Sequence, residues 1–311
     1  MKILFTGASS FTGQAFVREL AAAGCEVTAT FRQSPESYPD ELRRKRSASA
    51  AEVCRPVYGV AFGDEGFLEL ARQGGFDLLA HHAADVTNYK SADFDTVEAL
   101  RNNTRNLGAL LAALHAGGTR RVLLTGSVFE GGEGAGSQGL PDFSPYGLSK
   151  ALTAQAFRYY CARAGLALGK FVIPNPFGPF EEPRYTAYLM KNWFAGATPT
   201  CSSPSYVRDN IHVSLLAKEY VRFAKGLPAE GFARCNPSGY VESQGAFTLR
   251  LAEAMRPRLG LACAVALARQ TEFPEPRVRI NTDQPDAAAL GWDEQRAWDE
   301  FAQYYRALHK S

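Results

Sequence analysis

TGASSFTG, residues Thr6 to Gly13, follows a short apolar run and opens a segment with a helical pattern. Gly7 and Gly13 keep the outer positions of a G-x-x-G-x-x-G fingerprint, whose middle position is Ser10. Glycine lets the turn run tightly and lets a pyrophosphate approach the backbone, and a helix N-terminus supplies free N–H groups. The stretch predicts a dinucleotide phosphate site, with a tight structural turn as the alternative. The expected cofactor contacts in it are Gly7, Ser9, Ser10, Phe11, Thr12 and Gly13.

From this turn to about residue 176, short apolar runs alternate with longer segments of helical pattern. The alternation predicts a parallel sheet covered by helices, and apolar runs without polar alternation fit strands buried on both sides. After Pro176, proline and aromatic residues become dense and the elements become more polar. We expect an α/β fold, a Rossmann-type doubly wound parallel sheet with a smaller C-terminal α/β substrate domain. The expected dinucleotide-binding domain covers 1–176 and about 206–226, and the substrate-binding domain covers 177–205 and 227–311.

The composition excludes several classes of protein. The 311 residues are 46% hydrophobic and 21% charged, and a formal net charge of +2 implies no broad basic field for nucleic acid. No run approaches the ~18 apolar residues of a membrane span, and the apolar run in MKILFTGASS is too short for a signal-peptide core. None of the six cysteines pair as C-x-x-C, so we expect a cytoplasmic protein without a zinc site or redox motif.

Two segments have an unusual composition. The basic cluster RRKR, Arg43 to Arg46, is typical of a solvated loop, although it could bind an acidic ligand or tail. The low-complexity stretch EGGEGAGSQG, Glu130 to Gly139, is expected to be flexible unless a ligand orders it.

The end of the second strand bears on the choice of cofactor. Folds of this type that prefer NAD usually carry an Asp or Glu here to bind the ribose 2′-hydroxyl, whereas this chain has Arg32. A guanidinium suits a 2′-phosphate, so NADP(H) is favoured over NAD(H), with an exposed strand-end arginine as the alternative. Asp64 is placed to accept a hydrogen bond from the adenine amino group. His81 and His82 point to opposite faces of their strand, so no metal site is expected.

SPYGLSKAL, from Ser144 to Leu152, places Tyr146 four residues before Lys150 on a predicted helix. Ser127 ends the preceding apolar strand, at the sheet edge where open α/β sheets have their active sites. A tyrosine hydroxyl has an ordinary pKa near about 10, and a lysine charge one turn away lowers that pKa. The three side chains fit acid/base catalysis of hydride transfer, with Ser127 holding the reacting oxygen.

With these features the chain resembles the extended short-chain dehydrogenase/reductases, in the nucleotide-sugar epimerase/dehydratase group. The matching motifs run along almost the whole chain, and their order and spacing together are highly specific. They are TGASSFTG, GD at Gly63–Asp64, HHAA at His81–Ala84, Asn103 in a long helix, LTGSVF, YGLSK, PNPFGP at Pro174–Pro179, VRDNIHV at Val207–Val213 and LGW at Leu290–Trp292.

The resemblance implies roles for residues at the matching positions. Arg208 would hold the diphosphate of the substrate, with an ion pair to Asp209 as the alternative. The helix with Asn103 and the helix with Tyr146 would pair across a two-fold axis, giving a homodimer through a four-helix bundle. The further cofactor contacts implied are His82, Ala83, Ala84, Asn103, Thr125, Tyr146, Lys150, Pro174, Asn175 and Phe177. The substrate contacts implied are Ser127, Val128, Phe129, Asn175, Arg208 and Arg277.

Two departures from the family's pattern bear on the substrate. Val128–Phe129 stands where dehydratases carry an acid pair, which argues against 4,6-dehydration, although Glu130 is nearby. EFPEPRVR, residues 272–279, replaces the arginine-rich segment that usually completes the diphosphate clamp, with Arg277 or Arg279 as a candidate replacement.

The favoured function is an NADP(H)-dependent oxidoreductase acting at C4 of a nucleotide-activated sugar. A 4-ketoreductase is preferred because Arg32 favours NADPH and reductases exchange their cofactor at each turnover. A 4-epimerase with retained NAD(P) would use the same residues. Further alternatives are a nucleotide-sugar dehydratase, a reductase of a non-nucleotide carbonyl compound and a non-catalytic NADP-sensing regulator. Arg208 speaks against the carbonyl reductase, and the Tyr146 and Lys150 pair speaks against the regulator.

Overall fold

The computed structural model describes residues 1–136 and 139–309 and divides the chain into two compact units. The first unit comprises Met1–Glu133, Pro141–Ile173 and Ala217–Asn236. The second unit comprises Gly134–Leu140, Pro174–Leu216 and Pro237–Ser311.

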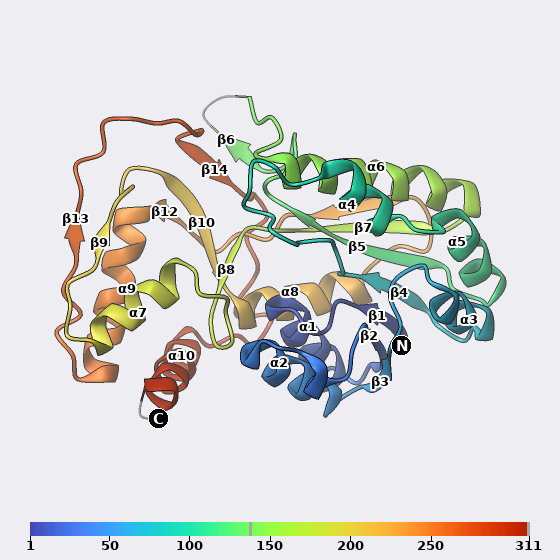
Figure 1. Ribbon diagram of the computed structural model, residues 1–311, viewed down its shortest axis with the longest axis horizontal. Coiled ribbons are helices and arrows are strands. Elements are labelled where there is room, and N and C mark those ends of the chain that lie inside the picture. The colour runs from blue at the N-terminus through green and yellow to red at the C-terminus, as the bar shows by residue number, and fades with distance from the viewer. Residues whose placement is uncertain (137–138, 310–311) are drawn as a thin grey trace. The chain divides into compact units, whose positions relative to one another are not determined.

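A parallel sheet forms the centre of the first unit (Figure 1). In the described part of the chain its order is β11-β7-β5-β4-β1-β2-β3, and every neighbouring pair is parallel. The direction of chain progress reverses between β1 and β4, the switch point where doubly wound sheets bind ligands. The predicted doubly wound α/β fold is confirmed. The strands are β1 (Lys2–Thr6), β2 (Glu26–Phe31), β3 (Arg55–Tyr58), β4 (Leu78–His81), β5 (Arg121–Ser127), β7 (Ala167–Ile173) and β11 (Phe232–Cys235).

Helices cover both faces of this sheet, with α4, α5 and α6 on one face and α1, α2 and α8 on the other (Figure 1). Leu110 of α5 and Phe157 of α6 are fully buried in one apolar cluster with Leu124 of β5. The helices are α1 (Phe11–Ala22), η1 (Pro35–Ser37), α2 (Glu41–Ala51), α3 (Glu65–Gln73), α4 (Thr96–Asn103), α5 (Leu107–Ala116), α6 (Pro145–Ala164) and α8 (Val213–Lys225).

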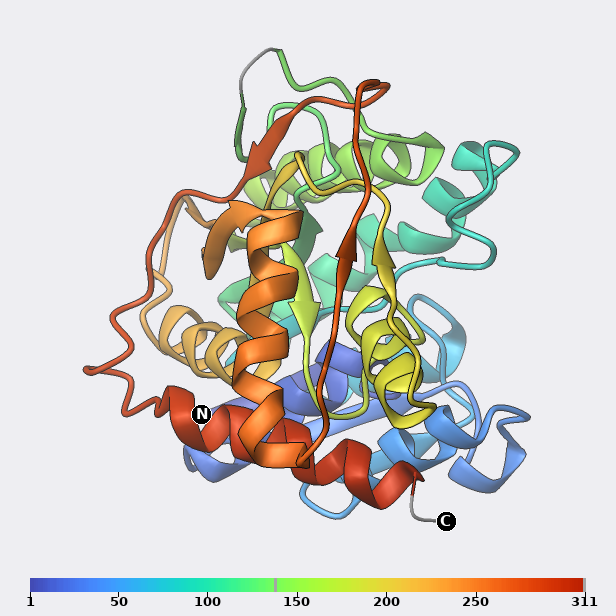
Figure 2. The same ribbon diagram turned by 90° about the vertical axis from the view of Figure 1, so that its left-hand side faces the viewer.

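The second unit is organised around β10 (Val207–His212), which pairs antiparallel with β12 (Tyr240–Ser243) and parallel with β14 (Val278–Ile280) and β8 (Asn175–Phe177). Its aromatic core joins α9 and α10, which pack together (Figure 2). The remaining elements are β6 (Ala135–Gly136), α7 (Tyr185–Phe194), β9 (Thr200–Cys201), α9 (Gln244–Leu259), β13 (Ala266–Leu267) and α10 (Glu294–His309).

The observed division differs from the predicted domains in the later segments. Residues 206–216 belong to the second unit because β10 forms its hydrogen bonds with β8, β12 and β14. Residues 227–236 belong to the first unit because β11 extends the parallel sheet beside β7. None of the helices in residues 1–136 and 139–309 has the length and apolar character needed to cross a membrane.

The long helix predicted around Asn103 is broken between α4 and α5. Asn106 has a left-handed φ of 53° and donates from its side-chain amide to the Gly63 carbonyl at 2.8 Å. Gly63 has a φ of 73°, and a Cβ added there would lie 2.0 Å from the Arg105 carbonyl oxygen. The close approach of these two segments explains both the break and the glycine of the GD motif.

The RRKR cluster is part of a helix and not of a loop, and the stretch from Glu130 to Gly139 contains both buried and exposed residues. The RRKR cluster lies on α2, and Arg46 is 2% exposed with its guanidinium carbon 5.9 Å from the centre of the Phe11 ring. In the stretch from Glu130 to Gly139, Glu130 is fully buried and Ala135–Gly136 forms β6. Ser137 and Gln138 of that stretch lie outside the described residues.

Candidate active site

The turn between β1 and α1 has the geometry of a phosphate loop. Ser10 caps α1, since its Oγ accepts a hydrogen bond from the Gly13 amide at 3.1 Å and donates to the Gly7 carbonyl at 2.9 Å. Gly7 has a φ of 84°, and a Cβ there would lie 2.7 Å from the Ala83 amide nitrogen. A Cβ on Gly13 would lie 2.1 Å from the Gly7 carbonyl oxygen. The serine in the middle position therefore supplies the cap while both outer glycines are sterically required, and the loop fits a dinucleotide pyrophosphate.

His82 joins the phosphate loop to β5. Its Nδ1 lies 2.9 Å from the Thr125 hydroxyl, and its Nε2 lies 3.1 Å from the hydroxyls of both Ser10 and Thr12. Burial lowers the pKa of His82 to about 3, and the charge of Lys150 acts in the same direction. A neutral imidazole thus connects the segments that follow β1, β4 and β5.

Two arginines, Arg32 and Arg43, follow β2, and one of them contacts the phosphate loop. Arg32 is exposed directly after Phe31, the last residue of β2. The pKa of Asp85 is lowered. Burial acts to raise this pKa, but hydrogen bonds from neighbouring residues and the charge of Arg32 lower it. Arg43 on α2 donates from Nε to the Ser9 hydroxyl at 3.4 Å. Arg32 therefore acts on Asp85, and a different guanidinium, that of Arg43, contacts the loop itself.

Asp64 and Asn103 hold structural positions in the first unit. Asp64 caps α3, since its carboxylate oxygens accept from the Phe67 amide at 2.8 Å and the Ala61 amide at 2.7 Å. Asn103 accepts from the Asp85 amide at 2.7 Å and donates to the Thr153 hydroxyl of α6 at 3.4 Å. Their assignments as cofactor contacts stay predictions.

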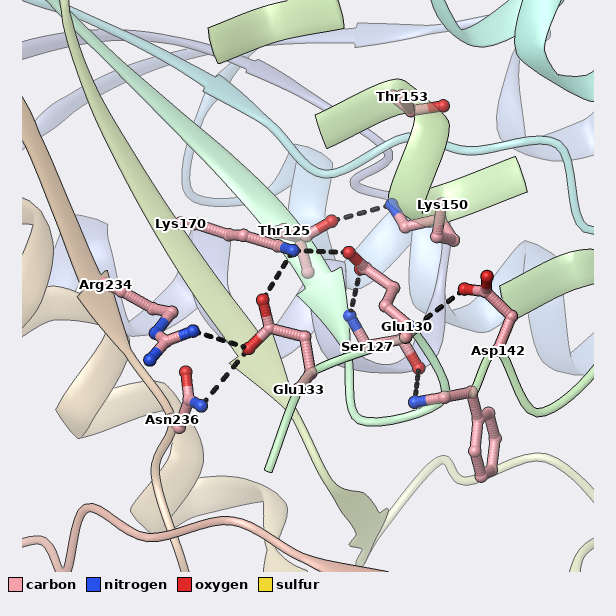
Figure 3. Close-up of polar contacts among 12 residues, drawn as sticks. Thr125, Ser127, Glu130, Glu133, Asp142, Lys150, Thr153, Lys170, Arg234 and Asn236 are labelled. Atoms are coloured by element: carbon pink, nitrogen blue, oxygen red, sulfur yellow. Dashed lines mark hydrogen bonds and ion pairs between the residues drawn. The ribbon is translucent and has the colours of Figure 1, made fainter. Parts of the chain in front are cut away.

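Lys150 is anchored to the end of β5 by its ammonium group. Its Nζ donates to the Thr125 carbonyl at 2.7 Å, and the residue is 4% exposed (Figure 3). Burial lowers the pKa of Lys150 to about 8, while the Glu130 carboxylate raises it and Lys170 lowers it. The ammonium group therefore keeps its proton at neutral pH although it is almost withdrawn from water.

The first turn of α6, which carries Tyr146, packs against the segment that follows Ser127. A Cβ on Gly147 would lie 2.3 Å from the Phe129 carbonyl oxygen, so the turn that carries Tyr146 touches the segment that follows Ser127. The Ser127 Oγ accepts from the Phe129 amide at 3.2 Å, which leaves its hydroxyl hydrogen to donate elsewhere. The Tyr146 ring meets the rings of two residues from the segment before α4, namely Tyr89 and Phe94, with centroid distances of 5.3 and 5.9 Å.

A profile of the NAD dependent epimerase/dehydratase family matches residues 3–230. The chain belongs to this family. The match confirms the resemblance stated from the sequence motifs and the prediction of a nicotinamide-dinucleotide-dependent enzyme of the short-chain dehydrogenase/reductase type. No curated protein matches the chain significantly.

Solved structures of similar fold come from epimerases and a dehydratase. UDP-glucose 4-epimerase from Thermotoga maritima, with UDP-glucose, is 18% identical over 99% of both chains, with a TM-score of 0.73. UDP-glucuronic acid 4-epimerase from Bacillus cereus, with UDP-glucuronic acid and NAD, is 17% identical over 99% of this chain and 100% of that one, with a TM-score of 0.74. The dTDP-glucose 4,6-dehydratase DesIV from Streptomyces venezuelae is 20% identical over 99% and 97%, with a TM-score of 0.69. These likenesses concern the fold.

The cofactor and substrate contacts that the resemblance implies in the second unit differ in burial and in bonding partners. Asn175 donates from its side-chain amide to the Asp209 carbonyl at 3.1 Å, and Phe177 is 2% exposed in the aromatic core. Arg208 pairs with Glu275 at 2.8 Å instead of with Asp209, so the alternative ion pair inferred from the sequence is wrong. The remaining predicted contacts in this unit are Pro174, which is buried, and Arg277, whose guanidinium lies 3.8 Å from the Phe273 ring centre.

Sequence reasoning missed a group of buried charges next to Ser127. The Glu130 carboxylate accepts from the Ser127 amide at 2.6 Å and pairs with Lys170 of β7 (Figure 3). Lys170 also donates to Glu133 at 2.8 Å. The sequence carries one signal of this group, because Lys170 interrupts the apolar run LGKFVI, residues 168–173. Val128, a predicted substrate contact, is 2% exposed, and Phe129 stacks on Phe143.

The low pKa of His82 predicts a loss of stability in acid. The pKa of His82 in the folded state lies below its unfolded value of about 6.5. The contribution of neutral His82 to the free energy of unfolding is therefore complete above that pH and is lost as the pH falls towards 3. A single buried histidine of this kind costs about 1.4 kcal/mol of unfolding free energy per pH unit in that window. Urea unfolding of His82→Gln between about pH 6.5 and 5 should give a shallower loss than the native chain. Equal slopes would show that His82 is protonated in the folded protein.

Proposed function

We propose that the protein is an NADP(H)-dependent oxidoreductase that acts at C4 of a nucleotide-activated sugar, most strongly as a 4-ketoreductase. The observation that carries the proposal is the arrangement at the end of β5. Ser127 ends this strand, Lys150 is anchored to the Thr125 carbonyl, and Tyr146 lies one turn before Lys150 on α6. This arrangement supports acid/base chemistry of hydride transfer beside a sugar hydroxyl.

The side chains divide the work around the reacting carbon. The nicotinamide, when bound, supplies or accepts the hydride. The Tyr146 hydroxyl would donate a proton to the sugar oxygen or take one from it, with the buried ammonium group of Lys150 one turn further along α6. The Ser127 hydroxyl holds that oxygen with the hydrogen that its own contact to Phe129 leaves available.

Arg32 and Arg43 support NADP(H). Arg32 follows β2, where an acidic side chain would serve the ribose 2′-hydroxyl of NAD, and Arg43 contacts the phosphate loop at Ser9. A guanidinium group suits a 2′-phosphate dianion, and the chain offers Arg32 at the strand end and Arg43 at the loop. Several solved relatives hold NAD, so this chain would differ from them in cofactor.

A nucleotide-activated sugar is supported by the family and by the sugar nucleotides that solved relatives contain. Arg208 is the residue proposed for the diphosphate, which would replace the Glu275 carboxylate as its partner. Arg277 from the same segment would assist. The six free cysteines agree with the cytoplasmic location expected from the sequence.

The position of Glu130 speaks against dehydration. A dehydratase needs an acid beside the sugar to eliminate water, and Glu130 is the nearest carboxylate in sequence after Ser127. Glu130 is fully buried and held by Lys170 and the Ser127 amide. A carboxylate committed to these partners is poorly placed to protonate a leaving group.

A 4-epimerase is the second candidate, because solved structures of similar fold are described as 4-epimerases. The two candidates differ in how they hold the cofactor. An epimerase that retains its cofactor should release NAD(H) or NADP(H) stoichiometrically when the purified protein is denatured. We expect little nucleotide in the supernatant, since a reductase exchanges its cofactor at each turnover, and near-equimolar nucleotide would favour the epimerase.

We also propose a homodimer through α4 and α6. Val97 of α4 is 76% exposed, and on α6 Leu148 and Tyr159 are 39% and 56% exposed. The two α6 residues lie about three turns apart and so share one face of the helix. Apolar side chains at such positions suit a helix-to-helix interface. Light scattering after size exclusion should give twice the chain mass of 33.9 kDa, and the single mass would contradict the dimer.

Replacement of the proposed proton donor gives the direct test of the chemistry. Tyr146→Phe should lower kcat with NADPH and a UDP-4-ketohexose by about 100-fold or more, because general acid catalysis contributes that much. The dissociation constant for NADPH should stay within about twofold, since the phenyl ring still packs against Tyr89 and Phe94. Phe94→Leu, which changes the ring environment and keeps the hydroxyl, serves as the control. Retained turnover in Tyr146→Phe would remove this residue as the acid.

Removal of the proposed 2′-phosphate ligand tests the cofactor. Arg32→Ala should weaken NADPH binding by about tenfold or more, because a charged hydrogen bond to the 2′-phosphate is lost. NADH binding should change little, which fluorescence titration of both nucleotides would measure. Arg72→Ala, an exposed arginine of α3, is the matched control for net charge. Equal losses for the two nucleotides would contradict the assignment of Arg32.

A further inference from the structure

A cluster of buried charges lies behind the strand end that carries Ser127 (Figure 3). We call Glu130, Glu133 and Lys170 the Glu130 cluster. Their side chains are 1%, 7% and 9% exposed, and Lys170 pairs with both carboxylates. At the outer side of the cluster Glu133 also meets Arg234 at 3.5 Å and accepts from the Asn236 amide at 3.3 Å.

The backbone around the cluster is adapted to it. A Cβ on Gly126 would lie 2.7 Å from the Lys170 Cε and 2.9 Å from the Glu130 Oε1. The glycine between Thr125 and Ser127 therefore leaves the space in which the ion pair passes the strand. Successive turns, from the Glu130 amide to the Ser127 carbonyl and from the Glu133 amide to the Glu130 carbonyl, bring both carboxylates to the same side.

Burying these charges costs free energy of hydration, so stabilisation of the core alone does not explain their presence. Each buried ion loses several kcal/mol of hydration, and apolar residues of similar volume often stabilise a core equally well or better. The two carboxylates are balanced by Lys170 and, at the outer side, by Arg234, and the Glu130 carboxylate also acts on the Lys150 charge. Glu130 raises the pKa of Lys150 and Lys170 lowers it, although burial is the larger influence. His81 and His82 also interact with the Lys150 charge. Burial is the largest cause of their lowered pKa values, and Lys150 lowers them further.

Glu130 connects the cluster to the site by direct contact. One carboxylate oxygen accepts from the Ser127 amide at 2.6 Å, and the other is held by Lys170. The adjoining Thr125 carbonyl accepts from the Lys150 ammonium. A shift of the Glu130 carboxylate would therefore move the Ser127 backbone and change the field at Lys150 together.

We propose that Glu130 and Lys170 are positioning residues for the catalytic step, Glu130 by holding the Ser127 backbone and balancing the Lys150 charge, and Lys170 by holding Glu130. The proposal rests on the proposed function for the step itself. The contacts that it invokes exist whatever the substrate.

The test compares three single variants of the full chain. Glu130→Gln removes the negative charge and presents an amide donor to the Lys170 ammonium. Lys170→Met removes the cation that holds Glu130. Glu133→Gln is the matched control, because Glu133 contacts Lys170 at 2.8 Å and no hydrogen bond joins it to Ser127 among the described contacts.

The first measurement is the pH titration of the Lys150 side chain by NMR of protein labelled with ¹³C at lysine Cε. The Lys150 signal is assigned by its loss in Lys150→Arg. We expect its midpoint to move to lower pH in Glu130→Gln and to higher pH in Lys170→Met, with a smaller change in Glu133→Gln. Opposite shifts from two halves of one ion pair distinguish a field at Lys150 from general loosening of the fold. This measurement needs no substrate, so it decides the proposal even if the proposed reaction is absent.

The second measurement is steady-state kinetics with NADPH and a UDP-4-ketohexose. Glu130→Gln should lower kcat by about tenfold or more through misplacement of Ser127, with the KM for NADPH within about twofold. Glu133→Gln should stay near the native kcat.

A double variant covers the case in which a single variant does not fold. The double variant Glu130→Met with Lys170→Met replaces the ion pair by uncharged side chains. Its unfolding temperature should return towards that of the native chain, whereas its kcat should stay as low as in Glu130→Gln. Recovery of both would show that the pair serves only the fold. An unchanged Lys150 titration in both Glu130→Gln and Lys170→Met would equally overturn the proposal.

Discussion

The Lys150 ammonium must keep its proton in a place almost closed to water. Burial alone would favour the neutral form of Lys150. The Thr125 carbonyl, which accepts from the ammonium group at 2.7 Å, and the charge of the Glu130 carboxylate favour the protonated form. Every other feature of the site is arranged around this charge. His82 stays neutral beside it, Tyr146 lies one turn before it, and Ser127 stands two residues after its anchor.

The phosphate loop and the acid/base centre are coupled through His82. Its ring bonds to the hydroxyls of Ser10 and Thr12 on one side and of Thr125 on the other. Thr125 in turn gives its carbonyl to Lys150. A continuous set of hydrogen bonds therefore runs from the N-terminus of α1 to the ammonium group, so the geometry at the pyrophosphate site and the geometry at the reacting carbon are linked.

Local pattern made the fold predictable from sequence. Strand and helix alternation predicted the doubly wound sheet, and the spacing of Ser127, Tyr146 and Lys150 led to their proposal as catalytic residues. The helix break at Asn106 was not predictable, because it depends on a tertiary contact with Gly63. The burial of Glu130 was missed for the same reason, since its partner Lys170 lies on another strand. Contacts between distant segments leave no periodic signal.

The space at Gly126 ties three positions of the sequence into one evolutionary unit. A side chain there would collide with Lys170 and Glu130, and loss of Lys170 alone would leave the buried Glu130 carboxylate without its cation. Substitutions at these three positions are therefore expected to be coupled. Lineages that have exchanged the ion pair for apolar residues should also be released from glycine at this point in β5. Correlated replacement among descendants would carry a historical record of this constraint.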